Sequence, residues 1–157
     1  MAELLRLVAW TPSETLIDAE QVEWVHVKLV GGKGRSDSAD AARSGNMVAV
    51  CDVDEGRLKA AVQQGNGKHG NDVKGYKDFR ELIAHKDIDA VCIATPDHWH
   101  PLICIAACHA GAHVYVEKPC SHNIREGRLL VEAARRNRVV VQHGTQSRSS
   151  PFIANGI

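Results

Sequence analysis

The sequence lacks the features that mark membrane, secreted and nucleic-acid-binding proteins. No run of 18 apolar residues occurs, which argues against a transmembrane helix. Lys plus Arg and Asp plus Glu both number 19, so no excess charge favours nucleic acid or an acidic membrane. The N-terminal stretch is interrupted by Glu3 and Arg6, whereas a secretory signal has an unbroken apolar run. We therefore expect a cytoplasmic protein without membrane or nucleic-acid partners.

The sequence also lacks the spacings that bind structural metals or triphosphates. Its five cysteines are an odd number, and no C-x-x-C pair occurs among them, so no metal site is predicted. A zinc site would need closely spaced Cys or His pairs, and reduced, buried cysteine is the favoured alternative. The phosphate-binding pattern G-x-x-x-x-G-K-[ST] is absent as well.

What the sequence does contain is an alternation of strand-like and helix-like segments. Short apolar runs bounded by turn residues predict strands buried on both faces of a parallel sheet. They cover residues 24–30, 47–51, 90–94, 112–116 and 139–142, with a further short strand at 73–76. Helices are predicted between them, at 36–43, after the capping residues Asp54, Asp78 and Asn123, and after Asp97, with Pro101 in the first turn of that helix. The fold class is therefore α/β, a doubly wound parallel sheet.

One segment breaks this alternation. Residues 64–74 (QGNGKHGNDVK) are rich in Gly and Asn, so we expect a mobile loop there. Residues 1–23 have no clear place in the repeat and are expected to form an N-terminal extension.

A glycine cluster follows the first predicted strand and suggests a dinucleotide-binding turn. Gly31, Gly32, Gly34 and Arg35 stand where backbone amides could surround a pyrophosphate at a helix start. The spacing does not match G-x-G-x-x-G, because the turn is about two residues short. An ordinary turn would also explain these glycines.

An acidic residue after the second strand strengthens this interpretation. Asp52 lies 21 residues after Gly31 (52 minus 31), close to the expected spacing of about 20. A carboxylate there could accept hydrogen bonds from the ribose hydroxyls and would repel a 2′-phosphate, which favours NAD over NADP. Asp52 could instead cap the next helix, and Arg57 keeps NADP open.

Two motifs at later strand ends carry a family resemblance. They read T-P-D-H-W-H at 95–100 and E-K-P at 117–119, and they lie where parallel sheets bind ligands. With the run between and around them, residues 25–151 closely resemble the Gfo/Idh/MocA oxidoreductases, which include glucose-fructose oxidoreductase and inositol dehydrogenase. The resemblance implies a Rossmann fold, NAD as cofactor and hydride transfer with a sugar or cyclitol hydroxyl.

The resemblance also implies roles for individual residues. Lys118 matches the catalytic lysine, which contacts substrate and assists proton transfer. Pro119 matches a proline whose preceding peptide bond is often cis, and His100 and Arg148 match positions near the substrate. The cofactor would be bound by Gly31, Gly32, Gly34, Arg35, Asp52, Thr95, Pro96, His98, Glu117, Lys118, Pro119 and Gln146.

The chain departs from the family in its length. Family members continue into a second α/β domain that holds the substrate, so we expect a dinucleotide-binding domain at 24–151 and a truncated linker at 152–157. The second, substrate-binding domain would be absent and activity alone would be low. A non-catalytic nucleotide-binding module and an inactive remnant are the alternatives to an oxidoreductase.

The expected loss of the second domain generates a prediction about association. Surface that normally packs against that domain would leave a sizeable apolar patch near the C-terminal tail, and such patches favour self-association. Light scattering over a concentration series should then show an average mass that rises with concentration. A constant monomer mass would contradict the prediction.

Overall fold

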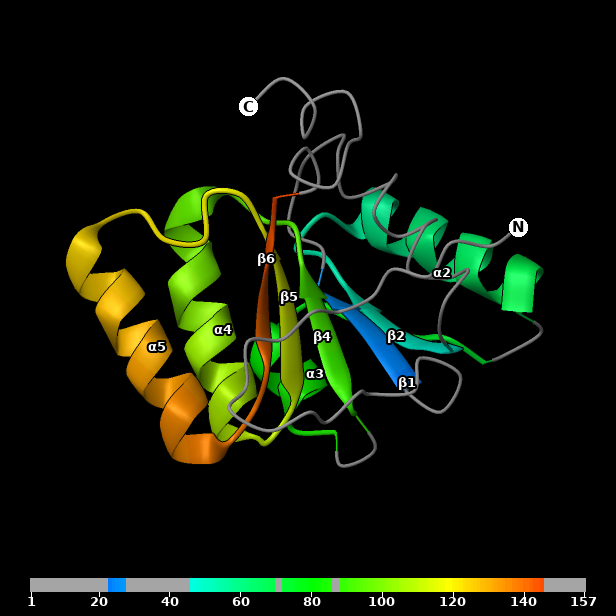
Figure 1. Cartoon of the computed structure of the whole chain (residues 1–157). Coiled ribbons are helices and arrows are strands. Elements are labelled where there is room, and N and C mark those ends of the chain that lie inside the picture. Colours follow the sequence, from blue (N-terminus) through cyan, green and yellow to red (C-terminus); the bar gives the residue numbers. More distant parts are fainter. Residues whose placement is uncertain (1–22, 28–45, 70–71, 86–87, 146–157) are drawn as a thin grey trace, which may run out of the picture.

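A computed structural model gives the arrangement of residues 23–27, 46–69, 72–85 and 88–145, and the description below concerns these residues. Within them, six strands form one sheet in the order β3-β2-β1-β4-β5-β6 (Figure 1). All neighbouring strands pair in parallel. The strands are β1 (Glu23–Val27), β2 (Asn46–Cys51), β3 (Lys74–Tyr76), β4 (Ala90–Ile93), β5 (His113–Glu117) and β6 (Val141–Gly144).

Helices cover both faces of this sheet. The described helices are α2 (Glu55–His69), α3 (Phe79–Ile83), the 3-10 turn η1 (Asp97–Trp99), α4 (His100–His109) and α5 (Ile124–Asn137). In Figure 1, α4 and α5 stand side by side on one side of the sheet and α2 lies on the other. None of the helices in the described ranges is both long and apolar enough to cross a membrane.

The strand order confirms the doubly wound fold expected from the sequence. The chain moves outward from β1 through β2 to β3, then returns to β4 beside β1 and continues outward to β6. This order, 3-2-1-4-5-6, is that of dinucleotide-binding α/β proteins. The direction of winding reverses between β1 and β4, and ligands of such sheets bind at that reversal, beyond the carboxyl ends of the strands.

Alternate residues of the strands supply two separate cores. Ala49 and Cys51 point to one face, where they pack with residues of α3, α4 and α5 such as Leu82 and Ile103. Val50 points to the other face and packs with Leu58 of α2. This alternation follows from the two-residue period of a strand, and it explains why strands such as β2 and β4 carry apolar residues on both faces.

Three of the described helices begin after the capping residues that the sequence predicted, whereas α4 begins at His100, after the 3-10 turn at Asp97–Trp99 and without a side-chain cap. The helix predicted at 36–43 lies outside the described residues. The Asp54 carboxylate accepts a hydrogen bond from the backbone N–H of Arg57 (2.8 Å), and Asn123 accepts one from Glu126 (3.0 Å). Asp78 caps α3 by accepting from the backbone N–H of Arg80 at 2.9 Å. Side-chain oxygens in these positions satisfy amides that have no partner inside the helix.

The mobile loop expected at 64–74 is wrong for its first half, because α2 continues to His69. Gly65 is buried there, and a Cβ atom on it would lie only 2.8 Å from both Met47 Cε and Val73 Cγ2. The glycine therefore permits close packing of α2 on the sheet rather than a loop. Asn66 reinforces this contact, since its Oδ1 accepts a hydrogen bond from the backbone N–H of Val73 at 2.7 Å.

The cysteines are buried thiols for the most part. Cys51, Cys92, Cys104 and Cys108 are buried, and Cys120 is partly buried. Burial raises the pKa of Cys51 to about 12 and that of Cys108 to about 11, so both thiols stay protonated at neutral pH. This agrees with the interpretation of these cysteines as small hydrophobic residues.

The last strand is held by a histidine. His113 Nδ1 accepts a hydrogen bond from the backbone N–H of Val140 (3.0 Å), just before β6 begins at Val141. Burial lowers the pKa of His113, and the Asp89 carboxylate opposes this effect more weakly. The neutral ring is therefore the form that fits the folded chain, because a protonated Nδ1 could not accept.

This bond predicts a pH dependence of stability. Because the pKa of His113 is lower in the folded than in the unfolded chain, its stabilisation is present above about pH 6.5 and is lost as pH falls. The free energy of unfolding, measured with urea from about pH 5 to 8, should fall more steeply toward acid pH in the native chain than in His113→Asn. The asparagine Oδ1 can accept the same hydrogen bond without titrating. His109→Asn, on an exposed helix end, is the control. Superimposable profiles for the native chain and His113→Asn would contradict the prediction.

Candidate functional site

The carboxyl ends of the parallel strands bring the predicted site residues to one edge of the sheet. Asp52 follows β2, Thr95 and Pro96 follow β4, and Glu117 ends β5 and leads into Lys118 and Pro119. The parallel pairing of β2, β1, β4 and β5 fixes this arrangement. Gly31, Gly32, Gly34 and Arg35, and likewise Gln146 and Arg148, lie outside the described residues.

Asp52 is a buried carboxylate with one oxygen unused by the described protein. The side chain is only 1% exposed, and its Oδ1 accepts a hydrogen bond from the backbone N–H of Asp54 at 2.9 Å. Its Oδ2 is buried and has no hydrogen-bond partner among the described residues. Buried polar atoms are nearly always paired in folded proteins, so an oxygen of this kind fits a ligand that donates hydrogen bonds. The two ribose hydroxyls of a dinucleotide are such donors.

The sequence left open that Asp52 caps the next helix, but its side chain does not cap α2. Asp54, two residues later, is the residue that caps α2 with its side chain. Asp52 instead supports the turn by holding the Asp54 amide, and its own backbone N–H donates to the Tyr76 carbonyl at 3.1 Å. The turn thus fixes the carboxylate at the end of β2 and leaves Oδ2 for another partner.

The segment after β4 forms a tight turn into α4. Thr95 is buried, and its hydroxyl donates to the Pro96 carbonyl at 3.2 Å, while Pro96 itself is exposed. Asp97 accepts a hydrogen bond from the backbone N–H of His98 at 2.8 Å. The His98 ring is exposed, which leaves it accessible at this edge of the sheet. Trp99 packs edge-on against Phe79, with ring centres 6.4 Å apart.

The segment after β5 places a buried acid beside an exposed base. Glu117 is 4% exposed, and its Oε2 accepts a hydrogen bond from the backbone N–H of Lys118 at 3.1 Å. The Lys118 side chain is exposed, and the peptide bond between Lys118 and Pro119 is cis, as the family resemblance implies. The ammonium group of Lys118 is therefore presented to solvent at the strand end while Glu117 is held inside.

The His100 ring is surrounded by protein and does not face the site as a substrate-contacting residue would. Its ring is 1% exposed, and its two nitrogens contact backbone oxygens: Nδ1 lies 2.6 Å from the Pro119 carbonyl and Nε2 lies 2.8 Å from the Thr95 carbonyl. Both polar atoms of the ring are thus occupied by the protein. These contacts do not support the predicted substrate contact and join the two strand-end segments instead.

Gly144 was not singled out in the sequence, yet it brings β6 against the acid of β5. A Cβ atom at this position would lie 2.9 Å from Tyr115 Oη, 3.1 Å from Glu117 Oε1 and 3.2 Å from Glu117 Cα. Only glycine fits such a close approach without movement of the neighbours. The signal in the sequence was a glycine at the end of a predicted strand, directly after His143.

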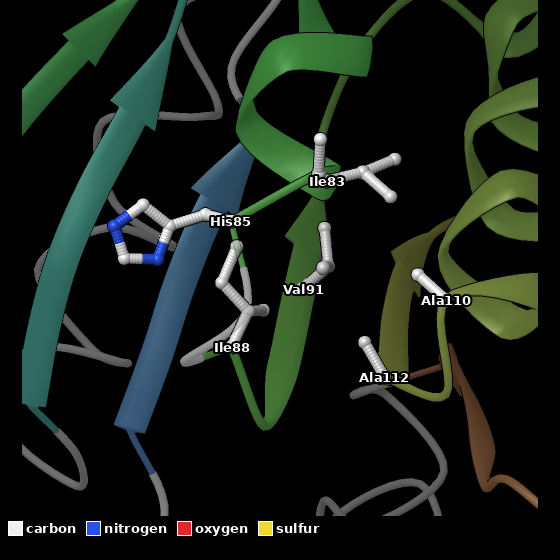
Figure 2. Close-up of a pocket in the computed structure, with 7 residues that line it drawn as sticks. Ile83, His85, Ile88, Val91, Ala110 and Ala112 are labelled. Carbon is white, nitrogen blue, oxygen red and sulfur yellow. The ribbon is translucent and has the colours of Figure 1, made fainter.

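A hollow elsewhere in the fold is not part of this edge. It has a volume of about 480 Å³ and lies at the opposite, amino-terminal side of β4 and β5, where Ile88, Val91 and Ala112 contribute to its wall. In Figure 2, the His85 ring points away from the aliphatic side chains of this hollow. In the described part of the chain, no group of three or more His, Cys, Asp or Glu side chains could hold a metal ion.

Comparison with known proteins agrees with this geometry. The model of the Gfo/Idh/MocA family, described as an oxidoreductase family with an NAD-binding Rossmann fold, matches residues 16–145. The chain belongs to this family. Rossmann-type sheets bind dinucleotides beyond the carboxyl ends of their strands, which is the edge where Asp52, Thr95 and Glu117 lie in this chain.

Individual relatives of this Gfo/Idh/MocA chain include dehydrogenases and a glycosyl hydrolase. Inositol 2-dehydrogenase of Salmonella typhimurium is 30% identical over 113 residues, which is 72% of this chain and 32% of the relative. Glycosyl hydrolase family 109 protein 2 of Shewanella sp. (strain ANA-3) is 30% identical over 146 residues, 86% of this chain and 32% of the relative. The chain spans about a third of the length of these curated relatives.

A solved structure gives the same result for the fold. The probable dehydrogenase from Thermotoga maritima superposes with a TM-score of 0.72 at 27% identity, over 84% of this chain and 38% of that chain. The shared part is therefore the dinucleotide-binding fold.

The close approach at Gly144 predicts a loss of stability on substitution. Gly144→Ala should lower the free energy of unfolding by about 1–3 kcal/mol, because the added methyl group must displace the β5 backbone or the Glu117 carboxylate. Denaturant unfolding followed by circular dichroism would measure this loss. Gly127→Ala is the control, since its nearest neighbour is the movable Ser121 hydroxyl at 3.0 Å and alanine favours a helix. Equal stability of Gly144→Ala and the native chain would refute the prediction.

Proposed function

We propose that this chain is the dinucleotide-binding part of an NAD-dependent oxidoreductase that transfers hydride between the nicotinamide ring and a sugar or cyclitol. The observation that carries the proposal is the buried Asp52 carboxylate at the end of β2, with its unpartnered Oδ2. The family membership and the inositol dehydrogenases among the relatives support the class of reaction. Because the chain spans about a third of those relatives, the activity of the whole protein is part of the proposal.

Asp52 would bind the adenosine ribose and select NAD over NADP. Its Oδ2 accepts hydrogen bonds from the ribose hydroxyls, and Oδ1 stays with the Asp54 amide. A 2′-phosphate at the same place would meet the negative carboxylate in a buried setting, where repulsion between like charges is strong. The pyrophosphate would be bound by Gly31, Gly32, Gly34 and Arg35, for which the sequence predicts a turn.

Lys118 would act on the reacting hydroxyl. It is exposed at the end of β5 and its backbone is fixed by the hydrogen bond to Glu117, so the ammonium can reach a substrate lying over the strand ends. There the ammonium would donate a hydrogen bond to the substrate oxygen and stabilise the negative charge that develops on it while the hydroxyl proton passes to solvent. NAD, when bound, supplies the hydride acceptor: the carbinol carbon loses hydride, its oxygen loses a proton, and a carbonyl forms.

The remaining predicted residues would surround the cofactor. Thr95, Pro96 and His98 after β4, and Glu117 and Pro119 at β5, lie on the β4 side of the reversal, and Asp52 after β2 lies on the β1 side. Gln146 and, toward the substrate, Arg148 would follow β6. Hydride transfer needs substrate and cofactor held close together. These residues mainly surround the cofactor, so they supply little of the substrate-binding part of the site.

One relative favours a second candidate function. The glycosyl hydrolase of Shewanella matches 86% of the chain, more than the inositol dehydrogenase does. A glycoside hydrolase built on this domain would release sugar without net change in the nicotinamide absorbance, whereas a dehydrogenase would produce NADH in step with product. A domain that binds nucleotide without catalysis would show neither.

Substitution of Asp52 tests the proposed binding site. Asp52→Asn should raise the Kd for NADH about tenfold, since it loses a charge-assisted bond to the ribose. The same change should lower the ratio of the Kd for NADPH to the Kd for NADH, because the neutral amide does not repel the 2′-phosphate. Fluorescence and calorimetric titration of the purified chain would measure both constants.

The matched control is Asp54→Asn, which keeps a good helix cap and changes the charge by the same amount two residues away. Its Kd for NADH should equal that of the native chain. The proposal fails if native protein binds no cofactor at millimolar concentration, and the assignment of Asp52 fails if both variants bind alike.

A further inference from the structure

We propose that His100 is a positioning residue whose doubly protonated ring ties the end of β4 to the end of β5, rather than a residue that contacts substrate. The ring lies between two backbone carbonyls, that of Thr95 at 2.8 Å from Nε2 and that of Pro119 at 2.6 Å from Nδ1. Thr95 follows β4 and Pro119 follows β5, so one side chain spans both segments that form the proposed cofactor site.

The chemistry of these two contacts requires two donors. A carbonyl oxygen only accepts hydrogen bonds, and a neutral imidazole carries a single N–H. A neutral His100 would therefore leave one nitrogen lone pair facing a carbonyl oxygen at less than 3 Å, which is repulsive. The imidazolium donates from both nitrogens, and the separations of 2.6 and 2.8 Å are those of charge-assisted bonds.

Burial makes the arrangement specific. With 1% of its surface exposed, the ring has no water to replace a lost partner. Both N–H groups of a buried imidazolium need hydrogen-bond partners, and the two carbonyls supply them to His100. No nitrogen remains for a substrate hydroxyl.

The position of His100 in the chain holds its ring rigidly between the Thr95 and Pro119 carbonyls. It is the first residue of α4, followed by the buried Pro101, so its backbone is fixed by the helix start. The ring then holds the Pro119 carbonyl in the segment that carries Lys118. Loss of either hydrogen bond would free the Lys118–Pro119 segment from the turn after β4, and small displacements of a catalytic group are costly.

The protonation state is tested on the native chain without any cofactor. Nitrogen-15 NMR of the histidine rings at neutral pH, assigned to His100 through its side-chain carbons, should show two protonated nitrogens of similar shift. One protonated and one unprotonated nitrogen would overturn the proposal. This measurement needs neither nucleotide binding nor a variant that folds, so its result is independent of the proposed function.

The positioning effect is tested with His100→Gln, whose two N–H donors lie on one nitrogen and so cannot take the places of both ring nitrogens. This part rests on the proposed function, since its readout is the Kd for NADH. We expect the Kd of the folded variant to rise about tenfold. His109→Gln, an exposed position at the other end of α4, should leave the Kd unchanged.

The outcomes separate the two proposals. If native chain binds no NADH, the proposed function fails while the ring-nitrogen result still decides the state of His100. If His100→Gln has a lower melting temperature but binds NADH as the native chain does, His100 is only structural and its positioning role is refuted. If the variant does not fold, the NMR measurement decides.

Discussion

Parallel pairing of the six described strands is the constraint on which the rest of the structure depends. Because each strand runs in the same direction, the turns that follow β2, β4 and β5 all emerge at one edge of the sheet. Crossovers between parallel strands place helices on both faces, so the strands must be apolar on both sides. Polar residues are then concentrated where strands end, and Asp52, Thr95 and Glu117 are the buried polar side chains at those ends.

The sequence predicted most of this arrangement because local signals and the global fold agree. Apolar runs bounded by turn residues predicted the strands to within a few residues, and Asp54, Asp78 and Asn123 predicted the helix starts through a bond that depends only on neighbouring residues. The Rossmann fold followed from the family resemblance, and the position of Asp52 followed from its spacing after the first glycine. These features are encoded within short segments of chain.

Features that depend on contacts between distant segments were not predictable in the same way. Gly65 reads as a loop residue by itself, and only the packing of α2 on Met47 and Val73 explains it. Likewise, the motif around His100 by itself suggests a residue that contacts substrate. Its actual partners, the Pro119 and Thr95 carbonyls, become neighbours only after β4 and β5 pair, so the sequence alone does not reveal them. Gly144 belongs to the same class, since its need for glycine comes from Glu117 on another strand.

Asp52 lies where β2 meets α2, and α2 packs on the sheet through a core of Met47, Val50, Leu58 and Val73. A ligand that binds only the folded form of a protein stabilises that form by an amount that rises with ligand concentration. A dinucleotide held by the Asp52 carboxylate would need β2 and α2 in place, because the turn between them fixes the carboxylate through the Asp54 amide. Cofactor binding would therefore stabilise the packing of α2 on the sheet as well as the site itself.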